Sequence, residues 1–156
     1  MKIRRFCNGD EIALLRVFLS SVHTIASRYY THEQIEAWAP PDINREQWAN
    51  HMTELRPFVA EVNGEIVGYA DIQPNGYIDH FYVSGTCSGQ GIGTLLMNYV
   101  HNESILLGVD QLTSNVSKAA EKFFKRQGFY VVERCFPVCR GVILQNALMR
   151  KNLTKY

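Results

Sequence analysis

The sequence predicts a mixed α/β fold (α+β), in which a central, mostly antiparallel sheet carries helices on both faces. Two observations predict it. First, Asn63-Gly64 separates two apolar runs, 58–62 and 65–70, and this dipeptide in such a setting indicates a two-residue β-hairpin. Second, a glycine-rich turn at 88–93 joins an apolar strand at 77–83 to an amphipathic helix. Glycines let a ligand approach the backbone, and the first helical turn offers unpaired N–H groups, so this junction predicts an anion site.

The other elements of the first half follow from periodicity and stop signals. The spacing of Thr31 and Gln34 is that of a capping box, and Pro40-Pro41 ends the helix that follows. The expected elements are a strand at 2–6, a helix from the turn at 8–10 to 29, a short helix after 31, a helical segment at 45–55, the hairpin, and a third meander strand at 77–83.

The second half predicts a closing set of helices and strands. Ser117 can cap a helix, and Gly128 can end it. The expected elements are a long helix to about 107, a strand at 112–116, a helix at 118–127, and closing strands at 131–137 and 142–150. The predicted order is β-α-α-β-β-β-α-β-α-β-β.

Composition limits the class of protein. The 156 residues (1–156) suit a single domain, and 46% hydrophobic with 20% charged residues is typical of a globular chain. A net charge of +1 gives no broad basic field, so we expect no nucleic-acid partner. The chain has no apolar run of about 18 residues and no apolar signal core near Met1, so we expect no membrane association and a cytoplasmic location.

The four cysteines, Cys7, Cys87, Cys135 and Cys139, are expected to be free thiols in a reducing compartment. Cys135 and Cys139 have no second cysteine pair and no histidine at the spacing of a zinc site. The sequence therefore predicts no bound metal.

The glycine-rich turn admits more than one interpretation. A nucleotide phosphate loop needs lysine after its last glycine, but Thr94 follows Gly93 directly. A dinucleotide-binding turn needs glycine at the position of Thr94 and a parallel βαβ setting, whereas antiparallel hairpins come before this turn. A turn that only packs a helix on a strand remains an alternative, because single glycine motifs are weak signals. The third interpretation is an acyl-CoA site.

The chain resembles the GNAT superfamily of N-acetyltransferases over nearly its whole length. The family signature, Arg/Gln-x-x-Gly-x-Gly/Ala, is matched in its latter half by Gln90-Gly91-Ile92-Gly93. Asn115, the helix at 119–126 and the closing Gly128-Phe129 follow in the family's order. Two positions depart from it: Ser88 replaces the first Arg or Gln, and Phe124 stands where many members have a tyrosine that protonates the leaving thiolate. Phenylalanine has no proton to donate.

The resemblance implies acetyl-CoA as cofactor and CoA as product. Backbone contacts of 81–83 would hold the pantetheine arm and the acetyl group, 88–94 would hold the pyrophosphate, and the next strand and helix would face the cofactor. The implied cofactor-binding residues are Phe81, Tyr82, Val83, Ser88, Gly89, Gln90, Gly91, Ile92, Gly93, Thr94, Asn115, Ser117 and Phe124.

Asp79 is the expected catalytic base or amine anchor. Side chains alternate along a strand, so Tyr77, Asp79 and Phe81 should share one face, and in this superfamily that face carries base candidates at the positions of Tyr77 and Asp79. A solvated strand aspartate is the alternative. His80 should point to the other face and serve a structural role. Tyr30 is the expected substitute for the missing acid.

The first helices usually shape the acceptor pocket in this fold. The expected acceptor-binding residues are His23, Tyr29, Trp38, Tyr77 and Cys139. Aromatic side chains there can hold an amine by cation–π contact, although core packing explains them equally well. Cys139 as a nucleophile lacks a visible histidine partner.

The resemblance implies an N-acetyltransferase that moves an acetyl group from acetyl-CoA directly to a primary amine of a small molecule or protein. Two alternatives remain open: a non-catalytic acyl-CoA-binding module, suggested by Phe124, and a protein-modifying acetyltransferase. The chain is expected to be a monomer or a homodimer.

Overall fold

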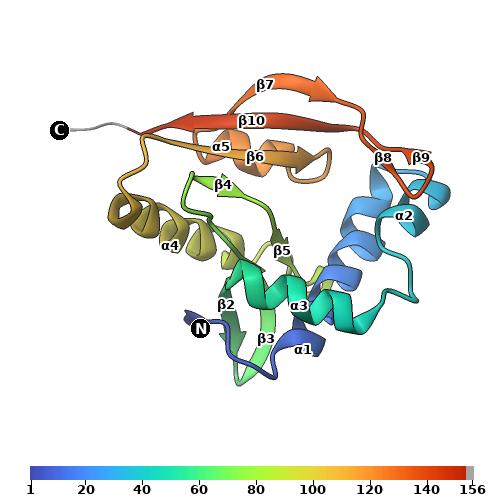
Figure 1. Cartoon of the computed structure of the whole chain (residues 1–156), viewed down its shortest axis with the longest axis horizontal. Coiled ribbons are helices and arrows are strands. Elements are labelled where there is room, and N and C mark those ends of the chain that lie inside the picture. Colours follow the sequence, from blue (N-terminus) through green and yellow to red (C-terminus); the bar gives the residue numbers. More distant parts are fainter. Residues whose placement is uncertain (154–156) are drawn as a thin grey trace.

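The computed structural model describes residues 1–153, and Figure 1 shows them as two sheets surrounded by helices. The strands are β1 (Lys2–Arg5), β2 (Phe58–Val62), β3 (Glu65–Ala70), β4 (Tyr77–Ile78), β5 (Phe81–Val83), β6 (Gln111–Ser117), β7 (Tyr130–Cys135), β8 (Val138–Cys139), β9 (Val142–Ile143) and β10 (Asn146–Asn152). The helices are α1 (Glu11–Ser20), α2 (His32–Trp38), α3 (Arg45–Leu55), α4 (Ile92–Leu107) and α5 (Glu121–Arg126). Within residues 1–153, no helix combines the length and the apolar character that a membrane crossing requires.

The first sheet has the order β1-β2-β3-β5, with antiparallel pairs throughout. The predicted hairpin is confirmed: β2 and β3 are joined by Asn63 and Gly64, whose φ values of 54° and 79° suit a tight hairpin turn. Helices cover both faces, as expected. Val59 and Tyr69 pack towards α1 and α3, whereas Ala60 packs on the side of α4.

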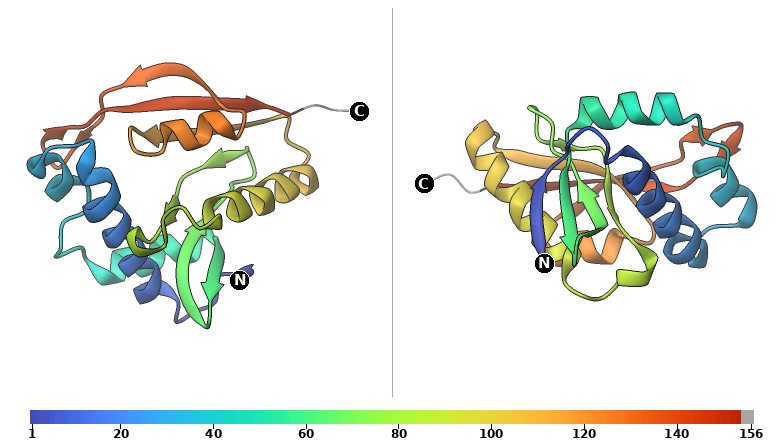
Figure 2. Two further views of the ribbon diagram at one scale, coloured as in Figure 1. Left: turned by 180° about the vertical axis from the view of Figure 1, so that it is seen from behind. Right: turned by 90° about the horizontal axis from the view of Figure 1, so that it is seen from below.

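The second sheet has the order β4-β6-β10-β7, in which β4 and β6 are parallel and the other pairs antiparallel. Figure 2 shows α4 and α5 in front when the molecule is seen from behind. A buried cluster that includes Leu96, Val116, Phe124 and Met149 fills the space between these helices and the two sheets.

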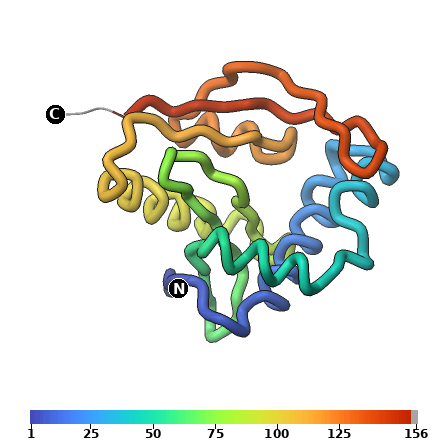
Figure 3. Tube along the Cα trace, in the orientation of Figure 1, coloured from blue at the N-terminus to red at the C-terminus, as the bar shows by residue number. Residues whose placement is uncertain are grey.

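The expected continuous strand at 77–83 is divided, and this is the main correction to the predicted sheet. β4 pairs with β6 in the second sheet, whereas β5 pairs with β3 in the first. Figure 3 shows the green segment leaving one sheet for the other. The residues between them, Asp79 and His80, belong to neither ladder, so the predicted central sheet opens into two at this point.

Other differences lie at helix and strand ends. The expected first helix changes at Ser21 into a π-helical turn, 21–25, and then a 3₁₀ turn, 26–28. α3 confirms the helical segment expected at 45–55, which the predicted order of elements had left out. The expected last strand is divided as well. Arg140 and Gly141 both have positive φ and fold β8 and β9 into a small hairpin that precedes β10.

The helix starts follow sequence signals in part. Thr31 caps α2 through Gln34 in the predicted capping box. Asp10 occupies the N-cap position of α1 but makes no side-chain cap. α5 begins at Glu121 rather than 118, because a turn follows β6 in which Ser117 Oγ accepts from the N–H of Ala120 at 3.3 Å.

Candidate active site

Two cavities meet where the sheets separate. One is a groove of about 420 Å³ that runs along the glycine-rich turn and the start of α4. The other has a volume of about 330 Å³ and lies between the first helices and β6. They share a junction lined by Trp38, Phe81, Tyr82, Ser117 and Ala120. Two ligands bound in the two cavities would therefore meet at this junction.

The groove begins at the anion turn, 88–94. Gly89 and Gly91 have φ values of 79° and 81°, in the left-handed region that favours glycine, and Gly91 is the N-cap of α4. No atom lies within 4 Å of where a Cβ would stand at either glycine, so both present bare backbone to the outside. The first-turn N–H groups of α4 lack partners within the helix and carry the positive end of its dipole. The turn therefore has the features of an anion-binding site.

A positive side chain lines the same groove from another element. Arg126, at the end of α5, lies in the groove lining, whereas the family signature places an Arg or Gln in the turn, where this chain has Ser88. Sequence reasoning missed Arg126, because the face that α5 presents depends on how that helix packs. Phe123, one turn earlier on α5, closes the groove against Gly93, where a Cβ would come within 3.2 Å of its ring.

Strand β5 supplies the wall between the turn and the junction. It is the edge strand of its sheet and pairs with β3 on one side. Its other edge faces the opening between the sheets, so its backbone N–H and C=O groups on that edge can bond a ligand that lies along it. Ten of the predicted cofactor-binding residues line this groove: Phe81, Tyr82, Val83, Ser88, Gly89, Gly91, Ile92, Gly93, Thr94 and Ser117.

The three remaining predicted cofactor residues lie elsewhere. Gln90 is exposed and outside the groove lining. Asn115 and Phe124 line the second cavity instead. Asn115 accepts a hydrogen bond from the Tyr77 hydroxyl at 2.9 Å, and the nearly buried ring of Phe124 packs edge-on against Phe81.

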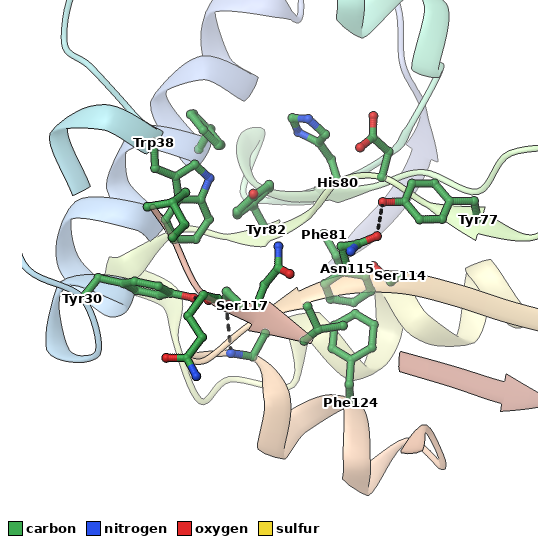
Figure 4. A pocket seen from close by; sticks show the side chains of 17 residues that line it. Tyr30, Trp38, Tyr77, His80, Phe81, Tyr82, Ser114, Asn115, Ser117 and Phe124 are labelled. Carbon is green, nitrogen blue, oxygen red and sulfur yellow. Dashed lines mark hydrogen bonds between the residues drawn. The ribbon is translucent and has the colours of Figure 1, made fainter. Parts of the chain in front are cut away.

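The second cavity has aromatic walls and one carboxylate. Figure 4 shows Trp38, Tyr30, Tyr82 and Tyr77 around it. The Trp38 ring lies 5.5 Å from that of Tyr30 and 6.4 Å from that of Tyr82, between centroids. The carboxylate is that of Asp79. Aromatic faces beside a carboxylate suit a cationic amine.

Asp71 explains how Asp79 reaches the cavity. Asp71 is 1% exposed, and its Oδ1 accepts the backbone N–H groups of Asp79 at 3.0 Å and of His80 at 2.6 Å. These are the two residues between β4 and β5 that neither strand ladder contains. Burial raises the pKa of Asp71 to about 6, against the effect of these hydrogen bonds. The buried Asp71 carboxylate thus stabilises the break between β4 and β5.

The side chain of His80 differs from its predicted placement. Strict alternation puts Asp79 and His80 on opposite faces, but both line the second cavity, because the break in the strand removes the alternation. His80 Nδ1 lies 3.0 Å from the hydroxyl of the buried Tyr69. Burial, with a smaller contribution from His51, lowers the pKa of His80 to about 3, so its imidazole is neutral.

His51 is a further residue that sequence reasoning missed. It comes from α3, and its Nε2 lies 3.3 Å from Asp79 Oδ2. No local pattern links it to Asp79, because the two lie on elements that meet only in the fold. The fold therefore brings Asp79 together with two imidazoles, of which that of His80 lines the cavity and that of His51 does not.

Tyr30 lies in the cavity wall, and its hydroxyl makes two hydrogen bonds. It donates to the carbonyl oxygen of Gln145 and accepts from the N–H of Lys118 at 3.0 Å. Burial raises the pKa of Tyr30. The side chain ties the first helices to the ends of β6 and β10, and its role as an acid stays a prediction.

Three predicted acceptor residues lie outside both cavity linings. His23 Nε2 is 2.7 Å from the carbonyl oxygen of Ala39. Tyr29 is 48% exposed. The Cys139 thiol faces the carbonyl oxygen of Ala37 at 3.2 Å. Of the predicted acceptor set, Trp38 and Tyr77 are the two that line the cavity with Asp79.

The comparisons with known proteins agree with this geometry. A family model described as an acetyltransferase (GNAT) domain matches residues 26–145. The chain is 30% identical over 150 residues to an uncharacterized N-acetyltransferase, YafP, of Escherichia coli K12, with 96% of this chain and 95% of the relative covered.

Solved structures with the same fold extend the likeness. A GCN5-related N-acetyltransferase from Rhodopseudomonas palustris superposes with a TM-score of 0.93 at 26% identity and covers 97% of this chain and 95% of its own. The structure of yncA from Salmonella typhimurium with its cofactor acetyl-CoA superposes with a TM-score of 0.72 at 19% identity, covering 100% of this chain and 95% of its own. The chain belongs to the GNAT family of acetyltransferases.

Proposed function

We propose that this acetyltransferase moves the acetyl group of acetyl-CoA directly to the primary amine of a small molecule. The observation that carries the proposal is the junction of the two cavities, because a two-substrate transfer needs both reactants in contact within one enclosed space. The groove suits a phosphate-bearing cofactor, and the aromatic cavity suits an amine.

Acetyl-CoA is the acyl donor. The pyrophosphate lies on the anion turn, 88–94, with Arg126 adding positive charge. The pantetheine arm runs along the free edge of β5 as an additional strand would. This course brings the thioester to Phe81 and Tyr82, where the cavities meet.

The acceptor amine binds beside Asp79. The carboxylate holds the ammonium and takes its proton, after which the amine nitrogen attacks the thioester carbonyl carbon. A C–N bond forms and the C–S bond breaks, the nitrogen loses its second proton to solvent as the amide forms, and CoA leaves as its thiolate. Free backbone N–H groups of β5 stabilise the oxyanion in between.

Phe124 cannot protonate the CoA thiolate, so another group must supply this proton. Tyr30 remains the proposed donor, and its present hydrogen bond to Gln145 must then be exchanged for one to the sulfur. Tyr30→Phe separates this role from a structural one. Loss of the acid lowers kcat and leaves acetyl-CoA affinity unchanged, whereas loss of a structural tie lowers the free energy of unfolding first.

The size of the acceptor follows from the cavity. Its 330 Å³ and its walls of Trp38, Tyr30 and Tyr82 enclose a small molecule with an apolar body and one amine. A protein acceptor would present a lysine side chain through the same opening, and the assay must therefore include peptides.

The test is a screen of primary amines with acetyl-CoA, read as release of the CoA thiol. Asp79→Asn removes the base and keeps the shape; kcat should fall about 100-fold or more while the Kd for acetyl-CoA stays constant. Asp42→Asn, an exposed aspartate outside both cavities, is the matched control. Acetyl-CoA binding without turnover of any amine would indicate a non-catalytic binding module. Turnover of peptides alone would indicate a protein-modifying enzyme.

A further inference from the structure

His51, Asp79 and His80 form a cluster of which the proposed acetyl transfer uses Asp79 alone. Each offers one ligand atom, and these three atoms lie within 4.8 Å of one another. The His51 and Asp79 side chains are 42% and 36% exposed, so the cluster has an open side towards solvent. It thus combines two imidazoles, one carboxylate and an access path.

The cluster is held from behind by buried groups. Asp71 fixes the backbone of Asp79 and His80 through two N–H groups, so that consecutive side chains serve one site. The Tyr69 hydroxyl contacts His80 Nδ1, which sets the ring orientation and leaves Nε2 for a ligand. Metal-binding histidines are typically held by such a partner on the second nitrogen.

We propose that His51, Asp79 and His80 bind one divalent transition-metal ion of the zinc class. Two imidazoles and a carboxylate are the donor set of open zinc sites, in which the fourth position is left to water or a ligand. Magnesium and calcium prefer more oxygen ligands than this cluster offers.

The distances fit with small side-chain movements. Ligand atoms around a tetrahedral zinc ion stand about 3.4 Å apart. His51 Nε2 and Asp79 Oδ2 are already 3.3 Å apart, and all three ligand atoms lie within 4.8 Å of one another. The side chains of His51 and Asp79 are partly exposed, so rotation of these two can shorten their distances to His80. His80 is the fixed ligand, because its ring is packed edge-on against Trp48 and held by Tyr69, so the movement falls to His51 and Asp79.

The ion would act as an inhibitor of transfer, a consequence that rests on the proposed function. Both the metal and the acceptor amine need the Asp79 carboxylate, whereas the cofactor groove does not include the cluster. Zinc should therefore compete with the amine and leave the affinity for acetyl-CoA unchanged.

The binding test uses the full chain freed of metal with a chelator and titrated with Co²⁺, whose visible spectrum reports its ligands. We expect one ion per chain, with ligand-field bands and without the charge-transfer band of a cysteine ligand. His51→Ala should weaken binding at least about tenfold. His32→Ala is the matched control, because His32 makes a similar contact with Glu36, at 3.9 Å, away from both cavities.

Three results would overturn the metal site: no Co²⁺ spectrum in the wild type, equal affinity in His51→Ala, or a sulfur charge-transfer band. Thermal unfolding of His51→Ala confirms that the variant is folded. Zinc inhibition of transfer is measured separately. Metal binding that leaves transfer unaffected would refute the proposed role of Asp79 and leave the metal site intact.

Discussion

The two cavities are built in opposite ways. The groove in which we propose that acetyl-CoA binds is formed around backbone features: a glycine-rich turn, a helix start and the free edge of β5. The acceptor cavity consists of side chains that come from α2, β4, β6 and the segment before β10. A backbone site is defined by local conformation, whereas a side-chain site is defined by how distant elements meet. The two should therefore respond differently to substitution.

The largest effect is expected on acetyl-CoA affinity, from a substitution in the glycine-rich turn. Gly91→Glu places a side chain at a φ of 81° and a negative charge among the phosphate oxygens. Loss of two charge-assisted hydrogen bonds should raise the Kd for acetyl-CoA about 100-fold or more. Titration calorimetry measures it.

The control for this substitution lies at the other end of the same helix. Gly108→Glu carries the same type of strain, since Gly108 has a φ of 70° and open space at its Cβ, but it is outside the groove lining. Equal loss of affinity in both variants would attribute the effect to strain and not to the anion site.

Asp71→Ala should produce the next largest effect, on the side-chain site. It leaves the N–H groups of Asp79 and His80 buried without an acceptor, which should lower the free energy of unfolding by about 2 to 4 kcal/mol. Urea unfolding measures the free energy of unfolding, and titration calorimetry measures the affinity for acetyl-CoA.

The affinity of Asp71→Ala for acetyl-CoA should stay within about threefold of wild type, a difference of under 1 kcal/mol, because the groove lining does not include Asp71. Asp110→Ala, at an exposed aspartate, is its control. Loss of cofactor affinity in Asp71→Ala would show that the two sites are coupled.

Arg126→Ala refines the comparison within the groove. It removes the positive side chain and leaves the turn unchanged, so the Kd for acetyl-CoA should rise about 5- to 20-fold, the equivalent of one charge-assisted hydrogen bond. The exposed Lys125, its neighbour outside the lining, provides the control variant Lys125→Ala. An unchanged Kd in Arg126→Ala would assign phosphate binding to backbone alone.

The smallest effect concerns neither cavity. The hydrogen bond from Arg4 lowers the pKa of Asp10 below 3.8, so the ionised carboxylate stabilises the fold above about pH 4 and this contribution is lost as the pH falls through the lowered pKa. Asp10→Asn should cost about 1 kcal/mol at pH 7, and this cost should shrink as the pH falls below about 4. Urea unfolding over a series of pH values measures it. A cost that stays constant down the acid side of the series would contradict the ion pair as its cause.

What the sequence could predict follows the same division. Asn63-Gly64, the capping box at Thr31 and the glycine-rich turn all act through neighbouring residues, and the structure has the hairpin, the helix start and the open turn where they were expected. The break at Asp79 was not predictable from alternation, because its cause, Asp71, lies on the other side of a turn.

Side-chain partners from distant elements escaped prediction for a similar reason. His51 meets Asp79 only because α3 packs beside the break in the strand. His23 lies in the π-helical turn and Tyr29 directly after the 3₁₀ turn, so neither has the α-helical phase that the sequence led us to expect, and neither lines the cavity. A helical period assumed up to residue 29 could not foresee that.

One experiment compares the two sites directly: the Kd for acetyl-CoA and the kcat for an accepted amine are measured in two variants. We expect Gly91→Glu to lose cofactor affinity, whereas Asp79→Asn should bind acetyl-CoA as the wild type does and lose turnover by about 100-fold. Equal loss of cofactor affinity in both variants, or normal turnover in Asp79→Asn, would contradict this expectation.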